Sequence, residues 1–117
     1  MRSLEFRAWD GKKMIDDVIP ASETSIIELY DRHEWQEIEA EAVEQYTGLK
    51  DKNGNEIYEN DILEDGSGEP LEYWLVRFED GKFIGSTQGV DEDIFELTDL
   101  DIVGNIHENG DLLEELK

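Results

Sequence analysis

The residues with the most versatile chemistry in this sequence are its two histidines, His33 and His107. His33 begins a His-Glu-Trp-Gln-Glu run that starts like the zinc-binding helix of a metalloprotease. Glu37 stands where that helix needs its second histidine, so the motif fails. The chain has no cysteine, which excludes a zinc–thiolate site. We expect both histidines to be surface or strand-edge residues that bind no metal.

Asp51, Asn53 and Asn55 have the spacing of the first three ligands in an EF-hand calcium loop. That loop needs glycine at its sixth position and glutamate at its twelfth, where this sequence has Glu56 and Ile62. The Asn-Gly pair inside the stretch is instead typical of a tight turn, because both residues tolerate a positive φ angle. We therefore predict a turn here and no calcium site.

Clustered carboxylates are the remaining source of chemistry. Asp91-Glu92-Asp93, with Asp99 or Asp101, is a candidate for weak divalent-cation binding, although a solvated acidic loop explains the same residues. Paired carboxylates for hydrolysis are expected by chance in a chain with 32 Asp and Glu. No nucleophile elbow, phosphate-binding glycine loop or Cys/His pair is present. We predict no enzyme, no catalytic residues, no cofactor and no metal, with an unrecognised carboxylate-based hydrolase as an alternative.

The composition indicates an acidic globular protein. Its 117 residues include 10 Lys and Arg against 32 Asp and Glu, for a formal net charge of -22. Direct nucleic-acid binding needs positive charge, so we expect none. No apolar run approaches about 18 residues and no signal-peptide core is present, so we expect a cytoplasmic protein without membrane contact. Three Trp, four Tyr and four Phe, mostly within short apolar runs, predict a folded core rather than a base-stacking surface.

Short apolar runs with turn signals between them, at a spacing of about ten residues, predict mainly antiparallel β structure in a small barrel or sandwich. The predicted strands are Leu4–Trp9, Met14-Ile15, Ser25–Tyr30, one starting at Ile62-Leu63, Tyr73–Phe78, Lys82–Ser86 and Asp101–His107, the last with a bulge at Gly104. In Tyr73–Phe78, alternation places Tyr73, Leu75 and Arg77 on one face and Trp74, Val76 and Phe78 on the other.

Other segments are predicted as loops or helical turns. Asp16–Thr24 and Asp91–Asp93 are predicted loops, and Ile94–Leu97 is a short strand or a turn of helix. Asp111 is expected to cap a short C-terminal helix that carries Leu112, Leu113 and Leu116.

Residues 31–47 have an ambiguous pattern. Trp35, Ile38, Ala42 and Tyr46 fall close to helical spacing, yet the glutamates between them also give an alternation with period two. We favour a loop followed by a strand near Ala42–Thr47, with a helix as the alternative.

Three stretches of this sequence resemble the YopX family, small proteins of bacterial phages and prophages. They are Phe6–Asp10, then Gln45–Gly54 continued by Glu56–Ile62, and finally Val103–Asn109. They occur in the expected order and span most of the chain. Asn60 departs from the pattern, since the family usually carries glycine there. Asparagine also accepts left-handed backbone geometry, so we expect that turn to survive.

The resemblance implies a mainly β fold with a small barrel-like (SH3-like) core, an N-terminal β segment and a short C-terminal helix. We expect a single domain over residues 1–117, with residues 1–47 as the N-terminal β segment and 48–117 as the core. The family brings no reaction and no catalytic residues. The expected function is that of a non-enzymatic phage or prophage accessory protein in the host cytoplasm. It would act by self-assembly as a homo-oligomer, or by binding a host or phage protein.

A second functional hypothesis comes from the charge distribution. From Phe83 to Leu116 the sequence has ten acids and no Lys or Arg. Carboxylates spaced along one face can imitate duplex phosphates, so the chain could act as a DNA-mimic decoy that inhibits a host nucleic-acid-binding protein. The alternative is that the acids only keep the protein soluble.

Overall fold

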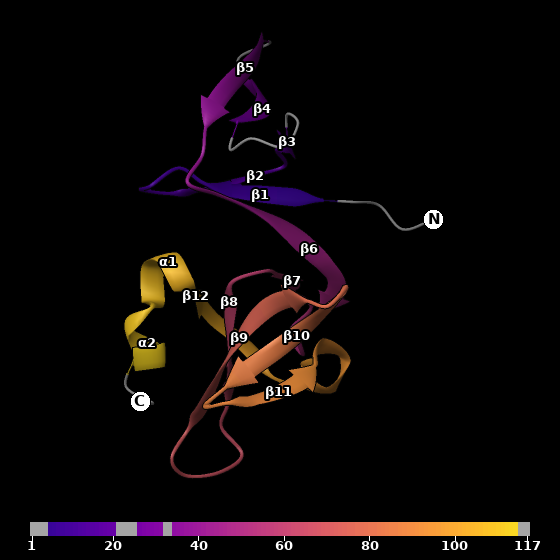
Figure 1. The fold of residues 1–117 in the computed structure, drawn as a ribbon, viewed down its shortest axis with the longest axis vertical. Coiled ribbons are helices and arrows are strands. Elements are labelled where there is room, and N and C mark those ends of the chain that lie inside the picture. The colour runs from indigo at the N-terminus through magenta and orange to yellow at the C-terminus, as the bar shows by residue number, and fades with distance from the viewer. Residues whose placement is uncertain (1–4, 21–25, 32–33, 115–117) are drawn as a thin grey trace. The chain divides into compact units, whose positions relative to one another are not determined.

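The computed structural model describes residues 5–20, 26–31 and 34–114, which form two compact units, residues 1–46 and 47–117. Figure 1 shows the ribbon with its strand and helix labels. Both units are built from antiparallel strands, so the predicted mainly β class is confirmed. In the described residues each α-helix has four residues, far too short to cross a bilayer.

The N-terminal unit contains two small antiparallel arrangements. Its strands are β1 (Phe6–Trp9), β2 (Met14–Asp16), β3 (Ile19–Pro20), β4 (Ile26–Asp31), β5 (Glu34–Glu39) and the first half of β6 (Ala42–Lys50). β1 lies between β2 and β6, whereas β4 lies between β3 and β5. Ala8, Val18 and Ala40 form the buried core of this unit. The strands predicted at its start, at Met14-Ile15 and at Ser25–Tyr30 are confirmed within the described residues.

Residues 34–39 and 42–47 are strand and not helix, so the strand favoured near Ala42–Thr47 is confirmed, but the loop expected before Ala42 is wrong. β5 occupies most of that loop, because its alternating residues pair with β4 in the register Ile27↔Ile38. The predicted loop Asp16–Thr24 likewise contains β3, where Ile19 pairs with Glu28. Residues 21–24 of that loop lie outside the described residues.

The C-terminal unit is a curled, half-barrel sheet with the strand order β11-β10-β9-β8-β12. Its strands are β8 (Asp61–Asp65), β9 (Glu72–Glu79), β10 (Lys82–Thr87), β11 (Val90–Asp93) and β12 (Asp101–Asn105), and the short β7 (Glu56–Tyr58) pairs with β6. The core consists of Ile57, Leu63, Trp74, Val76, Phe83, Ile94 and Leu97.

The two faces of β9 follow the predicted alternation. Trp74 and Val76 are buried, with 8% and 0% exposure, whereas Leu75 is only partly buried and Arg77 is exposed. Phe78 is 49% exposed at the end of the strand and packs edge-on against Phe83, with ring centroids 4.9 Å apart. The face of β9 that carries Leu75 and Arg77 is therefore left for other contacts.

Three predictions for the last third of the chain need correction. Asp91–Asp93 is not a loop but part of β11, because Gln88 and Gly89 adopt positive φ angles of 43° and 82° and close a hairpin with β10. The C-terminal helical segment begins before Asp111: α1 (Ile106–Asn109) is capped by Asn105, and α2 (Asp111–Glu114) follows. β12 therefore ends at Asn105 rather than at His107.

Two other predictions for this region are confirmed. Ile94–Leu97 forms a 3-10 helix, labelled η1, whose N-cap is Asp93. The register of β12 shifts between Ile102 and Gly104, which is the predicted bulge.

Candidate interaction site

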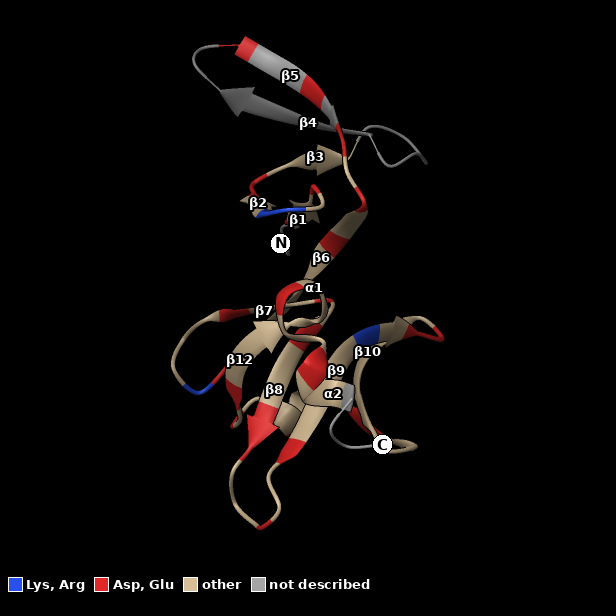
Figure 2. Cartoon of the chain, turned by 90° about the vertical axis from the view of Figure 1, so that its left-hand side faces the viewer, with Lys and Arg blue, Asp and Glu red and all other residues tan. Residues whose placement is uncertain are grey.

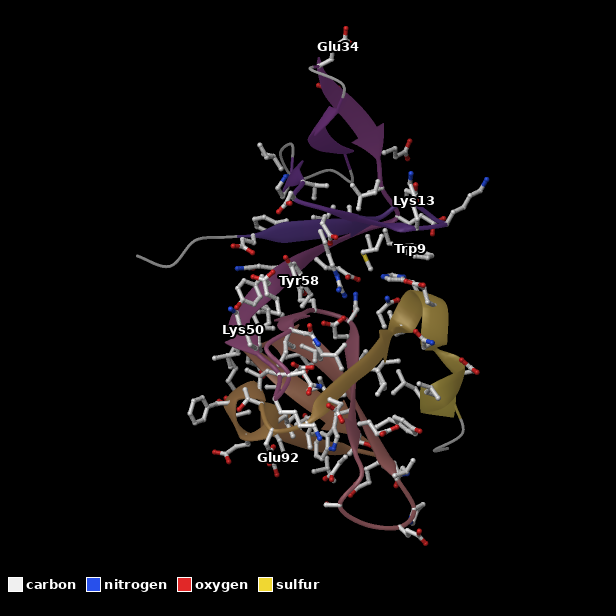
Figure 3. All side chains as sticks on the ribbon, turned by 180° about the vertical axis from the view of Figure 1, so that it is seen from behind. Trp9, Lys13, Glu34, Lys50, Tyr58 and Glu92 are labelled. Carbon is white, nitrogen blue, oxygen red and sulfur yellow. The ribbon has the colours of Figure 1, made fainter. Side chains whose placement is uncertain are left out.

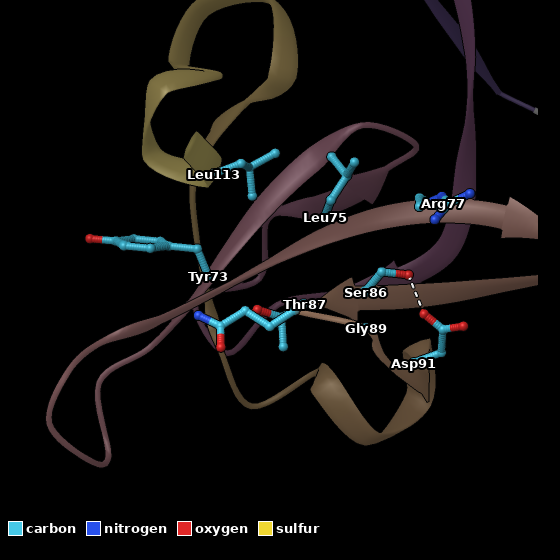
Figure 4. Close-up of a pocket in the computed structure, with 9 residues that line it drawn as sticks. Tyr73, Leu75, Arg77, Ser86, Thr87, Gly89, Asp91 and Leu113 are labelled. Carbon is cyan, nitrogen blue, oxygen red and sulfur yellow. Dashed lines mark hydrogen bonds between the residues drawn. The ribbon is translucent and has the colours of Figure 1, made fainter. Parts of the chain in front are cut away.

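A groove of about 470 Å³ lies on the outward face of β9 and β10, beside α2 (Figure 4). We call it the β9–β10 groove. It is lined by Tyr73, Leu75, Arg77, Ser86, Thr87, Gln88, Gly89, Asp91 and Leu113. Leu75 and Leu113 lie on the same side of β9 and supply apolar surface. Strand alternation produces this surface, because every second side chain of β9 points away from the core.

Polar groups stand around this apolar surface. The Ser86 hydroxyl donates a hydrogen bond to Asp91 Oδ1 over 2.6 Å, which joins β10 to β11. Arg77 forms an ion pair with Glu79, so its charge is compensated locally. Thr87 is only 7% exposed, and its hydroxyl has no hydrogen-bond partner among the described residues. An apolar surface with a few placed polar groups is the usual composition of a binding site.

A smaller hollow of about 210 Å³ adjoins the β10–β11 hairpin, and we call it the β11 hollow. It is lined by Glu79, Asp80, Lys82, Ile84, Asp91, Glu92 and Asp93, which are five acids and one base. Figure 3 shows Glu92 at the periphery of the C-terminal unit. Asp91 lines both the β11 hollow and the β9–β10 groove, so the two sites are adjacent.

A third concavity, of about 510 Å³, gathers acids at the ends of β8 and β12. It is lined by Lys52, Glu64, Asp65, Gly66, Ser67, Glu96, Leu97, Asp99, Leu100 and Asp101. Glu64 and Asp101, which both line it, are cross-strand neighbours, and Asp65 is the cross-strand neighbour of Glu72, which lies outside it. Lys52 Nζ lies 3.1 Å from Asp101 Oδ2. Figure 2 shows how far red segments outnumber blue ones in this unit.

The acids proposed from sequence as a cation site do not converge. Asp91 accepts the Ser86 hydroxyl, and Asp93 accepts the Phe95 amide over 3.0 Å. Asp101 instead faces the third concavity and accepts the Asn53 side-chain amide over 2.6 Å. Within residues 5–20, 26–31 and 34–114, no three His, Asp or Glu residues are grouped to hold a metal ion.

The C-terminal unit is secured at its first turn by the buried Asp51 carboxylate. Asp51 Oδ1 accepts the backbone amides of Asn53 and Asn55, both over 2.9 Å, and Oδ2 accepts that of Ile102 over 3.1 Å. Burial acts to raise the pKa of Asp51, but these donors outweigh it and the pKa lies below its ordinary value. The calcium-like spacing of these residues is thus explained by a turn, in which Gly54 has a φ of 85°.

The N-terminal unit contains a buried ion pair that sequence reasoning missed. Arg7 on β1 and Glu44 on β6 are cross-strand neighbours, and Arg7 Nε lies 2.8 Å from Glu44 Oε1. Their side chains are 11% and 1% exposed. In the sequence Arg7 lies near Arg2, Lys12 and Lys13, and nothing local distinguishes it from a surface arginine.

Two comparisons with known proteins match nearly the whole chain. Residues 5–114 match the profile of a protein family described as YopX protein. The chain belongs to the YopX family. The crystal structure of protein EF1440 from Enterococcus faecalis is similar, with a TM-score of 0.69 and 26% sequence identity over 97% of this chain and 99% of that one. No curated protein matches, and neither similarity specifies a ligand or a reaction.

The YopX-like stretches correspond to structural turns and caps. The middle stretch contains the Asp51 turn and a second turn in which Asn60 has a φ of 67°, so the asparagine does adopt the expected left-handed geometry. In the last stretch, Asn105 Oδ1 accepts the amides of His107 and Glu108, each over 3.0 Å. A Cβ atom on Gly104 would lie 2.1 Å from Asn109 Oδ1, so any other residue there would displace the Asn109 side chain.

The predicted positions of the two histidines can be compared with the structure. His107 lies in α1 and is half-buried, so the predicted strand-edge position is wrong. His33 lies outside the described residues.

Proposed function

We propose that this YopX-family chain is a non-enzymatic phage or prophage accessory protein that binds another protein in the cytoplasm of a bacterial host. The β9–β10 groove carries this proposal. It combines the apolar side chains of Leu75 and Leu113 with the polar groups of Ser86, Thr87 and Asp91. Such a surface can bury an apolar anchor of a partner while hydrogen bonds fix its orientation.

The carboxyl chemistry supports binding rather than catalysis. A general acid at neutral pH needs a carboxyl group whose pKa is raised. Among the residues that the structure describes, the pKa values of Asp10, Asp51 and Asp65 shift clearly, and each of these shifts is downward. Backbone amides of Lys13 and Lys12 lower the pKa of Asp10, and the hydroxyl and amide of Ser67 lower that of Asp65. Hydrogen bonds that stabilise turns therefore account for these shifts.

A pull-down from host lysate with paired variants tests the groove. Leu75→Gln removes apolar groove surface, and Leu71→Gln is the matched control because Leu71 is a 41% exposed leucine that does not line the groove. We expect the wild type and Leu71→Gln to capture the same partner. Leu75→Gln should capture at least about tenfold less of it, because the groove loses one apolar anchor. Thermal melting must first show that both variants fold. Equal capture by folded Leu75→Gln would reject the groove.

Self-association is the second part of the proposal, because large apolar side chains are exposed. Phe95 is 67% exposed, Val90 51% and Phe78 49%. Size exclusion with light scattering at tens of micromolar should give a mass above the 13.5 kDa of one chain. Added salt should increase association, because it screens repulsion between acidic copies. A single species of monomer mass at both low and high salt would contradict this prediction.

The decoy hypothesis is a second candidate, favoured by the acids gathered around the third concavity. An even scatter of acids would not imitate a phosphate array, whereas cross-strand acidic pairs place carboxylates side by side. The same pull-down separates the candidates. A polymerase, nuclease or nucleoid protein that is retained by Leu75→Gln and released by DNA would favour the decoy.

A further inference from the structure

The geometry points to an extended, basic segment of another protein that binds the C-terminal unit. This segment would pair with β11 and become the sixth strand of the five-stranded half-barrel sheet. This inference rests on the proposed protein-binding function and names the chemistry of the partner. The added strand would place one apolar side chain at the β9–β10 groove and a basic side chain at the β11 hollow.

The open edge of β11 is the first observation. β11 is the last strand in the order β11-β10-β9-β8-β12, and all four of its residues are exposed. Val90 follows the two-residue turn and pairs with Thr87, so alternation turns both backbone groups of Asp91 and the amide of Asp93 to the open side. An exposed edge of this kind accepts an extended peptide through main-chain hydrogen bonds.

Charge complementarity selects a basic partner. The β11 hollow is lined by five acids and one base, Lys82. Glu79 forms an ion pair with Arg77 outside the hollow, which leaves four acids against Lys82, so the hollow stays acidic. A second copy of this chain is a poor occupant, because its own β11 would bring Asp91, Glu92 and Asp93 against the same residues.

The two sites have the spacing of alternate strand residues. Asp91 and Asp93 are two positions apart on β11, so their side chains lie on one face of the sheet. Asp91 lines the groove, and both residues line the hollow. An added strand presents its own alternate residues on that face, so an apolar residue and a basic residue two positions away would lie beside the Asp91 end of the groove and beside the hollow. The buried Thr87 hydroxyl, which has no partner among the described residues, is an additional polar contact in the groove.

A synthetic peptide, Thr-Lys-Thr-Leu-Thr-Lys-Thr, tests this inference, since its symmetric pattern suits either strand direction. We expect NMR amide shifts centred on Val90–Asp93 and on the groove. Replacing both lysines by glutamates should weaken binding at least about tenfold, because like charges then face each other. N-methylation of alternate peptide amides should also abolish binding, because strand addition needs those donors. Asp91→Asn should weaken binding severalfold, whereas the exposed control Asp99→Asn should not.

Each contrary outcome has a distinct meaning. Equal binding of the N-methylated peptide would overturn strand addition, and equal binding of the glutamate peptide would overturn the basic partner. The same β11 shifts produced by raising protein concentration alone would assign the edge to a second copy instead. If no peptide binds while Leu75→Gln still loses its captured protein, this inference fails and the proposed function stands. If Leu75→Gln captures normally while the peptide binds β11, the groove fails as the general site.

Discussion

Replacing Glu44 with alanine is expected to lower the free energy of unfolding by about 3 to 5 kcal/mol, the usual cost of removing one partner of a buried ion pair. The Glu44 side chain is 1% exposed and its oxygen lies 2.8 Å from Arg7 Nε. Without it, the Arg7 guanidinium stays largely buried and loses the carboxylate that compensates its charge. Urea unfolding monitored by circular dichroism measures the change.

The matched control is Glu39→Ala, which removes an exposed strand glutamate from the same unit. It should change the free energy of unfolding by no more than about 0.5 kcal/mol. The double variant Arg7→Met/Glu44→Leu should recover most of the loss, because apolar residues of similar volume replace buried ion pairs well. A Glu44→Ala variant as stable as Glu39→Ala would show that the pair is hydrated.

Asp51→Ala is expected to destabilise the chain by about 2 to 4 kcal/mol, because three backbone amides lose a charged acceptor. Two of these amides, those of Asn53 and Asn55, shape the turn before β7, and the third, that of Ile102, lies on β12. The substitution therefore loosens a local turn and a contact across 51 positions of sequence. The exposed acid Asp99, replaced by alanine, is the control.

The contribution of Asp51 also has a defined pH dependence. Its pKa in the folded chain is lower than the ordinary value of 3.8, so the folded state holds the carboxylate more strongly than the unfolded state does. The difference in stability between wild type and Asp51→Ala should be complete well above pH 4 and shrink as pH falls through the folded pKa. A difference that stays constant down to pH 2 would show that the amides do not depend on the charge.

The sequence by itself determined most strand positions and the family. Alternation over Tyr73–Phe78 predicted which side chains share a face, because successive residues of a strand point to opposite faces. The Asn-Gly pair at 53–54 predicted its turn, because few residues accept a positive φ. These features depend on neighbours in the chain, and two of the three YopX-like stretches contain turns or a helix cap.

Local signals were insufficient where pairing with distant segments decided the conformation. Residues 34–39 became strand because β4 supplied a partner, and Asp91–Asp93 became an edge strand because the Gln88-Gly89 turn returned the chain along β10. The helical segment began at Ile106 because Asn105 was available as a cap at the end of β12. In each case the free energy of a tertiary contact outweighed a weak local preference.

Only the tertiary structure decided the roles of the charged residues. Arg7 and Glu44 are 37 positions apart, and Asp51 and Ile102 are 51 apart, so no local pattern marks either contact. The β9–β10 groove likewise joins residues from Tyr73 to Leu113. With 32 acids in the sequence, composition gives the charge of the whole chain. Burial and donor geometry determine which carboxylates are structural and which remain at the open edge of β11, because both depend on the packing of segments that are far apart in the chain.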